Sequence, residues 1–105
     1  MAWAQVEPNL VCEGTEPAWS LHIDAETARF LFQRDSDMTI PQRSVAEGRT
    51  WPQALTLVSR NDTAIVIIDS QSCDGAPYSA DVLTQRGQPP ILLTGCCKEA
   101  PCTAR

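Results

Sequence analysis

Hydrophobic and polar residues alternate along much of the chain with a period of two, which is typical of β-strands that bury one face. Two such runs, 19–23 and 28–33, flank a polar connection at 24–27 that is short enough for a hairpin. Their inward faces are expected to carry Trp19, Leu21 and Ile23 in the first run and Ala28, Phe30 and Phe32 in the second. The two runs are therefore predicted to pair.

Four further runs read as strands, at 54–59, 64–69, 78–85 and 91–97, and turn signals rich in Asn, Asp, Gly and Pro separate them. The long interval before them is expected to be connection. Residues 34–39 are polar, Pro41 cannot donate a hydrogen bond within a central ladder, and 41–52 should be the longest loop. Residues 1–11 are expected to be a loose lead-in and 98–105 an irregular tail.

No segment of the chain offers the long helix that a parallel crossover needs, so the strands should form an antiparallel sheet. Closure of this sheet would hide its edges and bury the alternating faces. We predict an all-β fold, a small antiparallel β-barrel of about seven to eight short strands. The barrel should occupy residues 1–105 as a single domain.

The net charge of the chain limits the classes of partner that it can bind. Thirteen acidic against eight basic residues give a net charge of -5, which repels polyanions and argues against nucleic-acid binding. No apolar run reaches the roughly 18 residues of a membrane-spanning helix. The first residues also lack a basic region followed by an apolar one, so no signal peptide is visible, as in a mature sequence preceded only by an initiator Met.

Five cysteines in 105 residues are typical of an oxidising compartment and of a disulfide framework. Cys96 and Cys97 are adjacent in a predicted strand, so they should point to opposite faces and bond different partners. We expect Cys12 to pair with one of them, closing a loop of about 85 residues that is worth roughly 4 to 5 kcal/mol. Cys73 would then pair with the other and leave Cys102 spare, whereas a short Cys97–Cys102 bridge is the competing arrangement.

Candidates for catalysis and metal binding are weak. A zinc site made of cysteines and His22 lacks any Cys-x-x-Cys pair, so no metal and no cofactor are expected. Ser20 and Asp24 share the face of His22, but they follow one another along a single strand and cannot form a nucleophile-base-orienter chain. We therefore expect a protein that is not an enzyme.

Four residues are candidate binding residues. Trp51 precedes Pro52 in the long predicted loop, where its ring would either plug one end of the barrel or form a contact patch. Glu16 is expected beside the bridge made by Cys12, with the Asp74 turn as its neighbour. Tyr78, at the start of a predicted strand, completes the set.

Three motifs suggest a relationship: Gly14-Thr15-Glu16-Pro17 followed by Trp19-Ser20-Leu21, then Cys73-Asp74-Gly75 with Tyr78, and finally Leu93-Thr94-Gly95-Cys96-Cys97. In order and spacing they resemble a family of uncharacterised bacterial envelope proteins, small periplasmic domains and lipoproteins of unknown function. The chain differs from that pattern at Ala18, where an aromatic is usual, and in its shorter Cys-Asp-Gly segment. The resemblance implies an envelope location and supports the disulfides, but it brings no catalytic residues.

A looser similarity is to the small β-barrel lysozyme inhibitors of the bacterial periplasm, which also link early and late strands by a disulfide. Their inhibitory loop motif is not evident in this chain. The function expected from sequence is thus a non-catalytic cell-envelope domain that acts as a protein-interaction module. An inhibitor-like protein or a small-ligand-binding barrel is the alternative, although a barrel of this size usually fills its interior with side chains.

Several expectations about the surroundings of the chain follow. We expect a monomer in the periplasm or at the outer membrane, with a lipid anchor in the full precursor as one route to the membrane. The partner would be a protein, and an acidic surface suits a basic one such as a c-type lysozyme.

Overall fold

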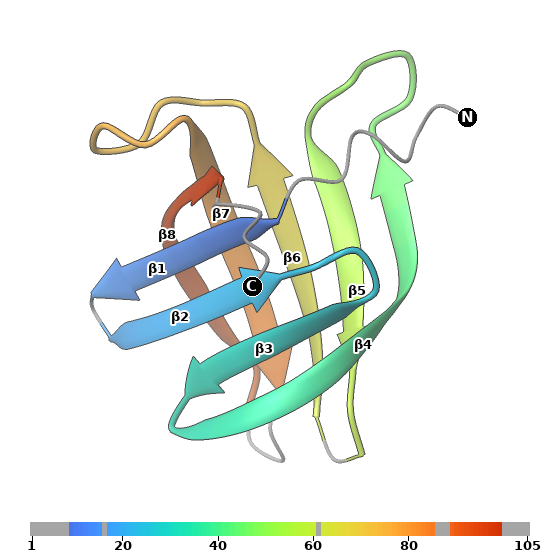
Figure 1. The fold of residues 1–105 in the computed structure, drawn as a ribbon, viewed down its shortest axis with the longest axis vertical. Coiled ribbons are helices and arrows are strands. Elements are labelled where there is room, and N and C mark those ends of the chain that lie inside the picture. Colours follow the sequence, from blue (N-terminus) through green and yellow to red (C-terminus); the bar gives the residue numbers. More distant parts are fainter. Residues whose placement is uncertain (1–8, 16, 61, 86–88, 100–105) are drawn as a thin grey trace.

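The computed structural model describes residues 9–15, 17–60, 62–85 and 89–99 and folds them into a closed barrel of eight antiparallel strands. The strands are β1 (Leu10–Thr15), β2 (Ala18–Ile23), β3 (Thr27–Phe32), β4 (Arg34–Val45), β5 (Gln53–Val58), β6 (Thr63–Asp69), β7 (Tyr78–Gln85) and β8 (Ile91–Glu99). Each strand pairs with the next, and β8 pairs with β1 to close the ring (Figure 1). The predicted fold class is confirmed.

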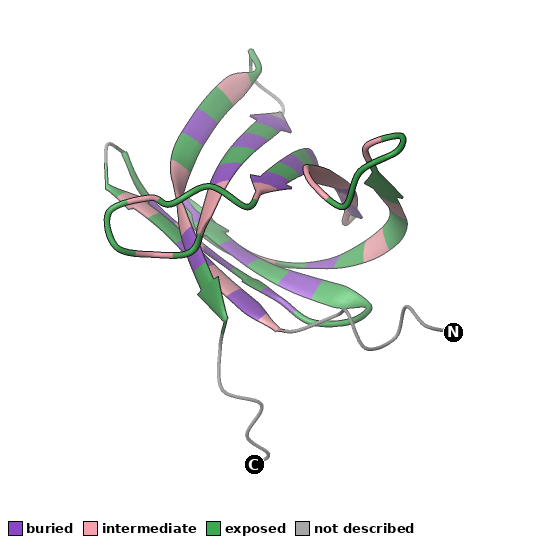
Figure 2. Cartoon of the chain, turned by 90° about the horizontal axis from the view of Figure 1, so that it is seen from above, coloured by how far each residue is buried: buried purple, intermediate pink, exposed green. Residues whose placement is uncertain are grey.

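The alternation seen in the sequence builds the interior. Buried and exposed residues alternate along β3 and β6, and Figure 2 shows such alternating bands along the strands of the barrel. Besides the disulfide-bonded Cys12, five inward side chains have no exposed area, namely Leu21, Phe30, Leu57, Val66 and Val82. Each buried side chain of this kind stabilises the fold by about 2 kcal/mol relative to an exposed one. The predicted inward faces of the first hairpin are also confirmed.

β4 corrects the predicted connection between residues 34 and 52. It is a strand of 12 residues with one fully buried side chain, Met38. Its first half pairs with β3 and its second half with β5, and a bulge between Thr39 and Gln42 separates the two. Pro41 lies within this bulge, where its missing N–H costs no ladder hydrogen bond. Because only one side chain of β4 is fully buried, the strand lacks the alternation that would have revealed it in the sequence.

The ends of the barrel strands also differ slightly from the expected bounds. β1 begins at Leu10 and β8 ends at Glu99, so each strand takes two residues from a stretch expected to be irregular. Leu10 lies directly opposite Glu99 in the β1–β8 pairing. The first and last described strands therefore meet along a short seam.

Two disulfides end on β8: one crosses the seam between β1 and β8, and the other ties the β6–β7 loop to β8. Cys12 and Cys97 face each other across β1 and β8, with their Cα atoms 4.0 Å apart and almost no exposed area, so their bridge lies inside the barrel. Cys73 pairs with Cys96, whose side chain points outward and is half-buried. The expectation that Cys96 and Cys97 bond different partners is confirmed. Cys102 lies outside the described residues.

Candidate functional site

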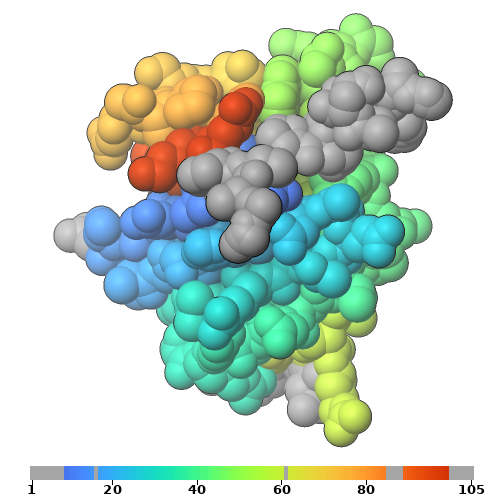
Figure 3. All heavy atoms as spheres, viewed as in Figure 1, coloured from blue at the N-terminus to red at the C-terminus, as the bar shows by residue number. Residues whose placement is uncertain are grey.

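Two long loops lie at the same end of the barrel, at the top of Figures 1 and 3. They are residues 46–52, between β4 and β5, and residues 70–77, between β6 and β7. We call these loops, together with Tyr78, the loop end. Three of the four predicted binding residues, Trp51, Asp74 and Tyr78, belong to it, whereas Glu16 lies outside the described residues.

Trp51 and Tyr78 come from different loops and pack together. Their ring centroids are 5.1 Å apart, with the ring planes tilted by 40°. Both rings pack against the core and remain partly exposed. Tyr78 lies opposite the buried Cys97, so its side chain is on the inward face of β7. Trp51 therefore covers the end of the core and also presents part of its ring to solvent.

Glu99 joins this aromatic pair from β8. The Tyr78 hydroxyl donates a hydrogen bond to Oε2 of Glu99 at 3.2 Å. Burial, the nearby negative charge of Glu99 and this hydrogen bond, in that order, raise the pKa of Tyr78 above its usual value. Sequence reasoning missed Glu99. Glu99 lies two residues beyond Cys97 in β8, so the two side chains share one face of the strand. The pairing of Cys97 with Tyr78 would therefore have pointed to Glu99.

Asp74 is presented by a tight turn. Cys73 and Ala76 exchange both backbone hydrogen bonds, at 2.9 and 2.8 Å, and enclose Asp74 and Gly75. Both enclosed residues have positive φ, 47° and 87°, the conformation of the two-residue turn for which Asp-Gly is a preferred sequence. The Asp74 side chain is exposed. Because Cys73 is bonded to Cys96, the turn is held against β8.

The first and last sequence motifs meet around Trp19, inside the barrel. The Trp19 Nε1–H donates to the carbonyl oxygen of Thr94 at 3.1 Å. A Cβ atom at Gly14 would overlap the indole nitrogen of Trp19, and one at Gly95 would overlap the Glu13 carbonyl oxygen. Only glycine leaves room for the buried ring at both positions. Gly14, Trp19 and Gly95 therefore serve the packing of the barrel.

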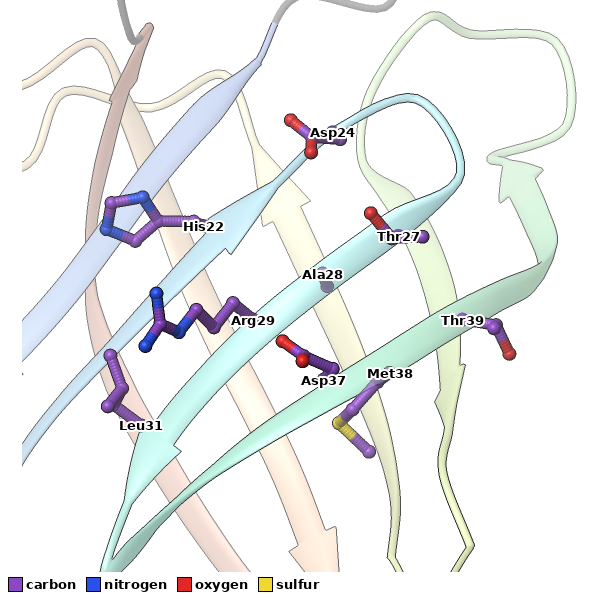
Figure 4. A pocket seen from close by; sticks show the side chains of 9 residues that line it. All are labelled: His22, Asp24, Thr27, Ala28, Arg29, Leu31, Asp37, Met38 and Thr39. Atoms are coloured by element: carbon purple, nitrogen blue, oxygen red, sulfur yellow. The ribbon is translucent and has the colours of Figure 1, made fainter.

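The outer face of β2, β3 and β4 carries a partly open depression of about 570 Å³ (Figure 4). Its lining includes His22, Arg29 and Asp37, which are neighbours in register across the three strands. The Arg29 guanidinium donates to both carboxylate oxygens of Asp35 at 2.6 to 3.2 Å and lowers the pKa of Asp35. The His22 side chain is exposed, as predicted, and makes no hydrogen bond within the described chain.

A buried carboxylate, paired with a partly exposed arginine, lies at the opposite end of the barrel from the loop end. Asp62, in the turn between β5 and β6, is 4% exposed and accepts hydrogen bonds from Arg34 at 2.9 Å and from Ser36 at 3.1 Å. The sequence indicated only a turn at Asp62. The buried carboxylate instead links that turn to β4, and a buried charge requires such partners.

No metal-binding cluster is found among the described residues, since no three His, Cys, Asp or Glu side chains gather there. The same residues include no helix with the length and hydropathy for crossing a membrane. Comparisons with protein-family models, with curated proteins and with solved structures give no match. The resemblance to bacterial envelope proteins thus stays an expectation from the motifs.

Proposed function

We propose that this chain is a non-catalytic domain of the bacterial cell envelope that binds a protein partner through the loop end. The observation that carries the proposal is the contact between Trp51 and Tyr78, two partly exposed aromatic rings 5.1 Å apart on a disulfide-braced barrel end. Large aromatic side chains held rigidly in a partly desolvated site are the residues that contribute most to protein interfaces.

The rigidity of the loop end supports the proposal. The β4–β5 loop is closed by the Ala46 N–H, which donates to the Pro52 carbonyl at 3.0 Å. The β6–β7 loop is closed by its tight turn and by the Cys73–Cys96 bridge. Side chains fixed in this way lose little conformational entropy when a partner binds. The two disulfides also favour an oxidising compartment such as the periplasm.

The charge of the loop end favours a basic partner. Asp74 is exposed at the tip of one loop, and Glu99 lies beside the aromatic pair. Together with the net charge of -5, these acids would speed the approach of a cationic protein and align it. An inhibitor of a c-type lysozyme is the concrete candidate. A ligand inside the barrel has less support, because the inward side chains of β2, β3, β5, β6 and β7 are buried against one another.

The experiment is a binding and inhibition assay with a purified c-type lysozyme at low and physiological salt. Removal of a central aromatic anchor by Trp51→Ala should weaken binding by about tenfold or more. Asp74→Asn should slow association severalfold, chiefly at low salt. Asp37→Asn is the matched control, because it removes the same charge from the outer face of β4. It should change neither the binding affinity nor the association rate.

Three outcomes decide the proposal. Absence of binding and inhibition at both salt concentrations would remove the lysozyme assignment. An equal loss in Asp37→Asn and Asp74→Asn would show that overall charge, and not the loop end, attracts the enzyme. Binding that survives Trp51→Ala unchanged would overturn the loop end as the site.

A further inference from the structure

The outer face of β6, β7 and β8 carries a continuous row of exposed apolar side chains. Ile65 lies opposite Leu83, and Leu83 lies opposite Leu92, so the three are direct neighbours across the sheet. Their exposed fractions are 43%, 43% and 62%, and nearby Ile67 is 42% exposed. We call these four residues the apolar row. They are four of the six large exposed hydrophobic residues in the described chain.

One carboxylate lies within this face. Asp81 is paired in register with Ile67 on one side and with Thr94 on the other, and its side chain is exposed. It makes no hydrogen bond or ion pair with the described residues. Asp35 and Asp62, by contrast, are both paired with arginines. Asp81 is therefore an acid without a partner beside an apolar surface.

We infer that the apolar row and Asp81 form a second docking surface, for a segment of another protein that combines apolar side chains with a lysine or arginine. The apolar side chains would cover Ile65, Leu83 and Leu92, and the cation would pair with Asp81. Since the barrel is closed, it offers no strand edge for such a segment to extend. Recognition on this face must therefore use side chains, and the row supplies them.

Charge favours a basic segment of another protein over two other possible occupants of this face, a second copy of the chain and a membrane surface. A second copy of the chain would bring another net charge of -5 and another Asp81 to the same interface, and like charges oppose that contact. A membrane surface attracts apolar faces that are flanked by lysine and arginine. β6 and β7 contain neither residue, and β8 contains only Lys98, six positions beyond Leu92. A basic amphipathic segment fits both the apolar row and the acid.

The test uses isotope-labelled protein, nuclear magnetic resonance, and two synthetic amphipathic helices of about 18 residues with the same pattern of leucines. One peptide carries lysine and the other glutamate at the polar positions. The lysine peptide should shift the amide signals of Ile65, Asp81, Leu83 and Leu92, and the glutamate peptide should not. Shifts confined to other strands, no shifts at millimolar peptide, or equal shifts from both peptides would each overturn the inference.

Variants locate the contact. Leu83→Gln should weaken binding of the lysine peptide by about 5- to 30-fold because it removes buried apolar area, and Asp81→Asn should weaken it by about 2- to 5-fold. Leu31→Gln is the matched control, because it changes an exposed leucine of similar burial on the outer face of β3, and it should have no effect. Equal losses in Leu83→Gln and Leu31→Gln would show unspecific adhesion and overturn the site.

Further measurements exclude the other occupants and separate this surface from the loop end. Self-association in sedimentation that Leu83→Gln abolishes would assign the face to a second copy. Retention on anionic or neutral vesicles that depends on Leu83 would assign it to a membrane. Trp51→Ala should leave peptide binding unchanged. If Trp51→Ala removes the peptide shifts and Leu83→Gln does not, the inference fails while the proposed function of the loop end stands.

Discussion

The Cys12–Cys97 bridge should stabilise the barrel more than the Cys73–Cys96 bridge. The first closes a loop of 85 residues and the second a loop of 23 residues. In the chain-entropy model these loops correspond to about 4.6 and about 3.4 kcal/mol at 25 °C. For a domain whose total stability is about 5 to 15 kcal/mol, loss of either bridge is severe, and loss of the first should be worse.

The structure adds a second reason why the Cys12–Cys97 bridge should stabilise the barrel more than the Cys73–Cys96 bridge. β1 and β8 pair over only four residues each, from Leu10 to Glu13 and from Cys96 to Glu99. The Cys12–Cys97 bridge lies in the middle of that short seam and faces the core. Without it, the few backbone hydrogen bonds of the seam must close the barrel alone. The Cys73–Cys96 bridge only attaches a loop to β8.

The assay is urea unfolding of two double variants, followed by far-ultraviolet circular dichroism. Cys12→Ala with Cys97→Val removes the inner bridge while filling part of its volume, and Cys73→Ala with Cys96→Ala removes the outer one. With a slope of about 1.2 kcal/mol/M, the inner variant should unfold at a midpoint about 1 M lower in urea than the outer variant. Non-reducing peptide mapping serves as the control that the remaining bridge is intact. An outer variant that unfolds at the same or lower urea would refute the reasoning.

Three further predictions concern single side chains. Tyr78 is the only tyrosine of the chain, so tyrosinate absorbance should titrate with a midpoint above that of free tyrosine and move back in Glu99→Gln. Because this pKa is raised in the folded state, the protonated form favours folding, and stability should fall as the pH rises above about 10. The buried Thr84 hydroxyl makes no hydrogen bond with any described residue, so Thr84→Val should be neutral or should raise the unfolding free energy by about 1 kcal/mol in urea titrations. Asp62→Ala should lower it by about 1 to 2 kcal/mol because it removes the buried acceptor of the hydrogen bonds from Arg34 and Ser36, and a loss below about 0.5 kcal/mol would contradict that role.

Most of the fold was predicted from the regular alternation of hydrophobic and polar residues. The main error, the loop predicted where β4 lies, arose because that alternation is absent there. β3 and β6 alternate strictly because one face of each is buried and the other is solvated. β4 has a single fully buried side chain and reaches two neighbours through a bulge, so its sequence resembles a polar loop. Strands held mainly by backbone pairing leave little trace in side-chain pattern.

The sequence predicted several residues of the candidate site, but it did not predict that they lie together. Trp51 and Asp74 could be singled out because a tryptophan in a loop and an Asp-Gly turn are local signals. The contact of Trp51 with Tyr78 depends on how the two loops meet, which is set by the registers of four strands. The apolar row was hidden for a similar reason, since Ile65, Leu83 and Leu92 become neighbours only when β6, β7 and β8 pair.

The nesting of the two disulfides has a consequence for how the chain must be oxidised. The Cys73–Cys96 pair lies wholly within the segment between Cys12 and Cys97. When such a chain emerges from its amino end into an oxidising compartment, Cys12 meets Cys73 before either native partner has arrived. A thiol oxidase that joins cysteines in order of appearance would therefore make a non-native Cys12–Cys73 bond. Under such sequential oxidation the native bridges would form only after thiol-disulfide exchange, whereas oxidation after β1 has closed onto β8 would form them directly.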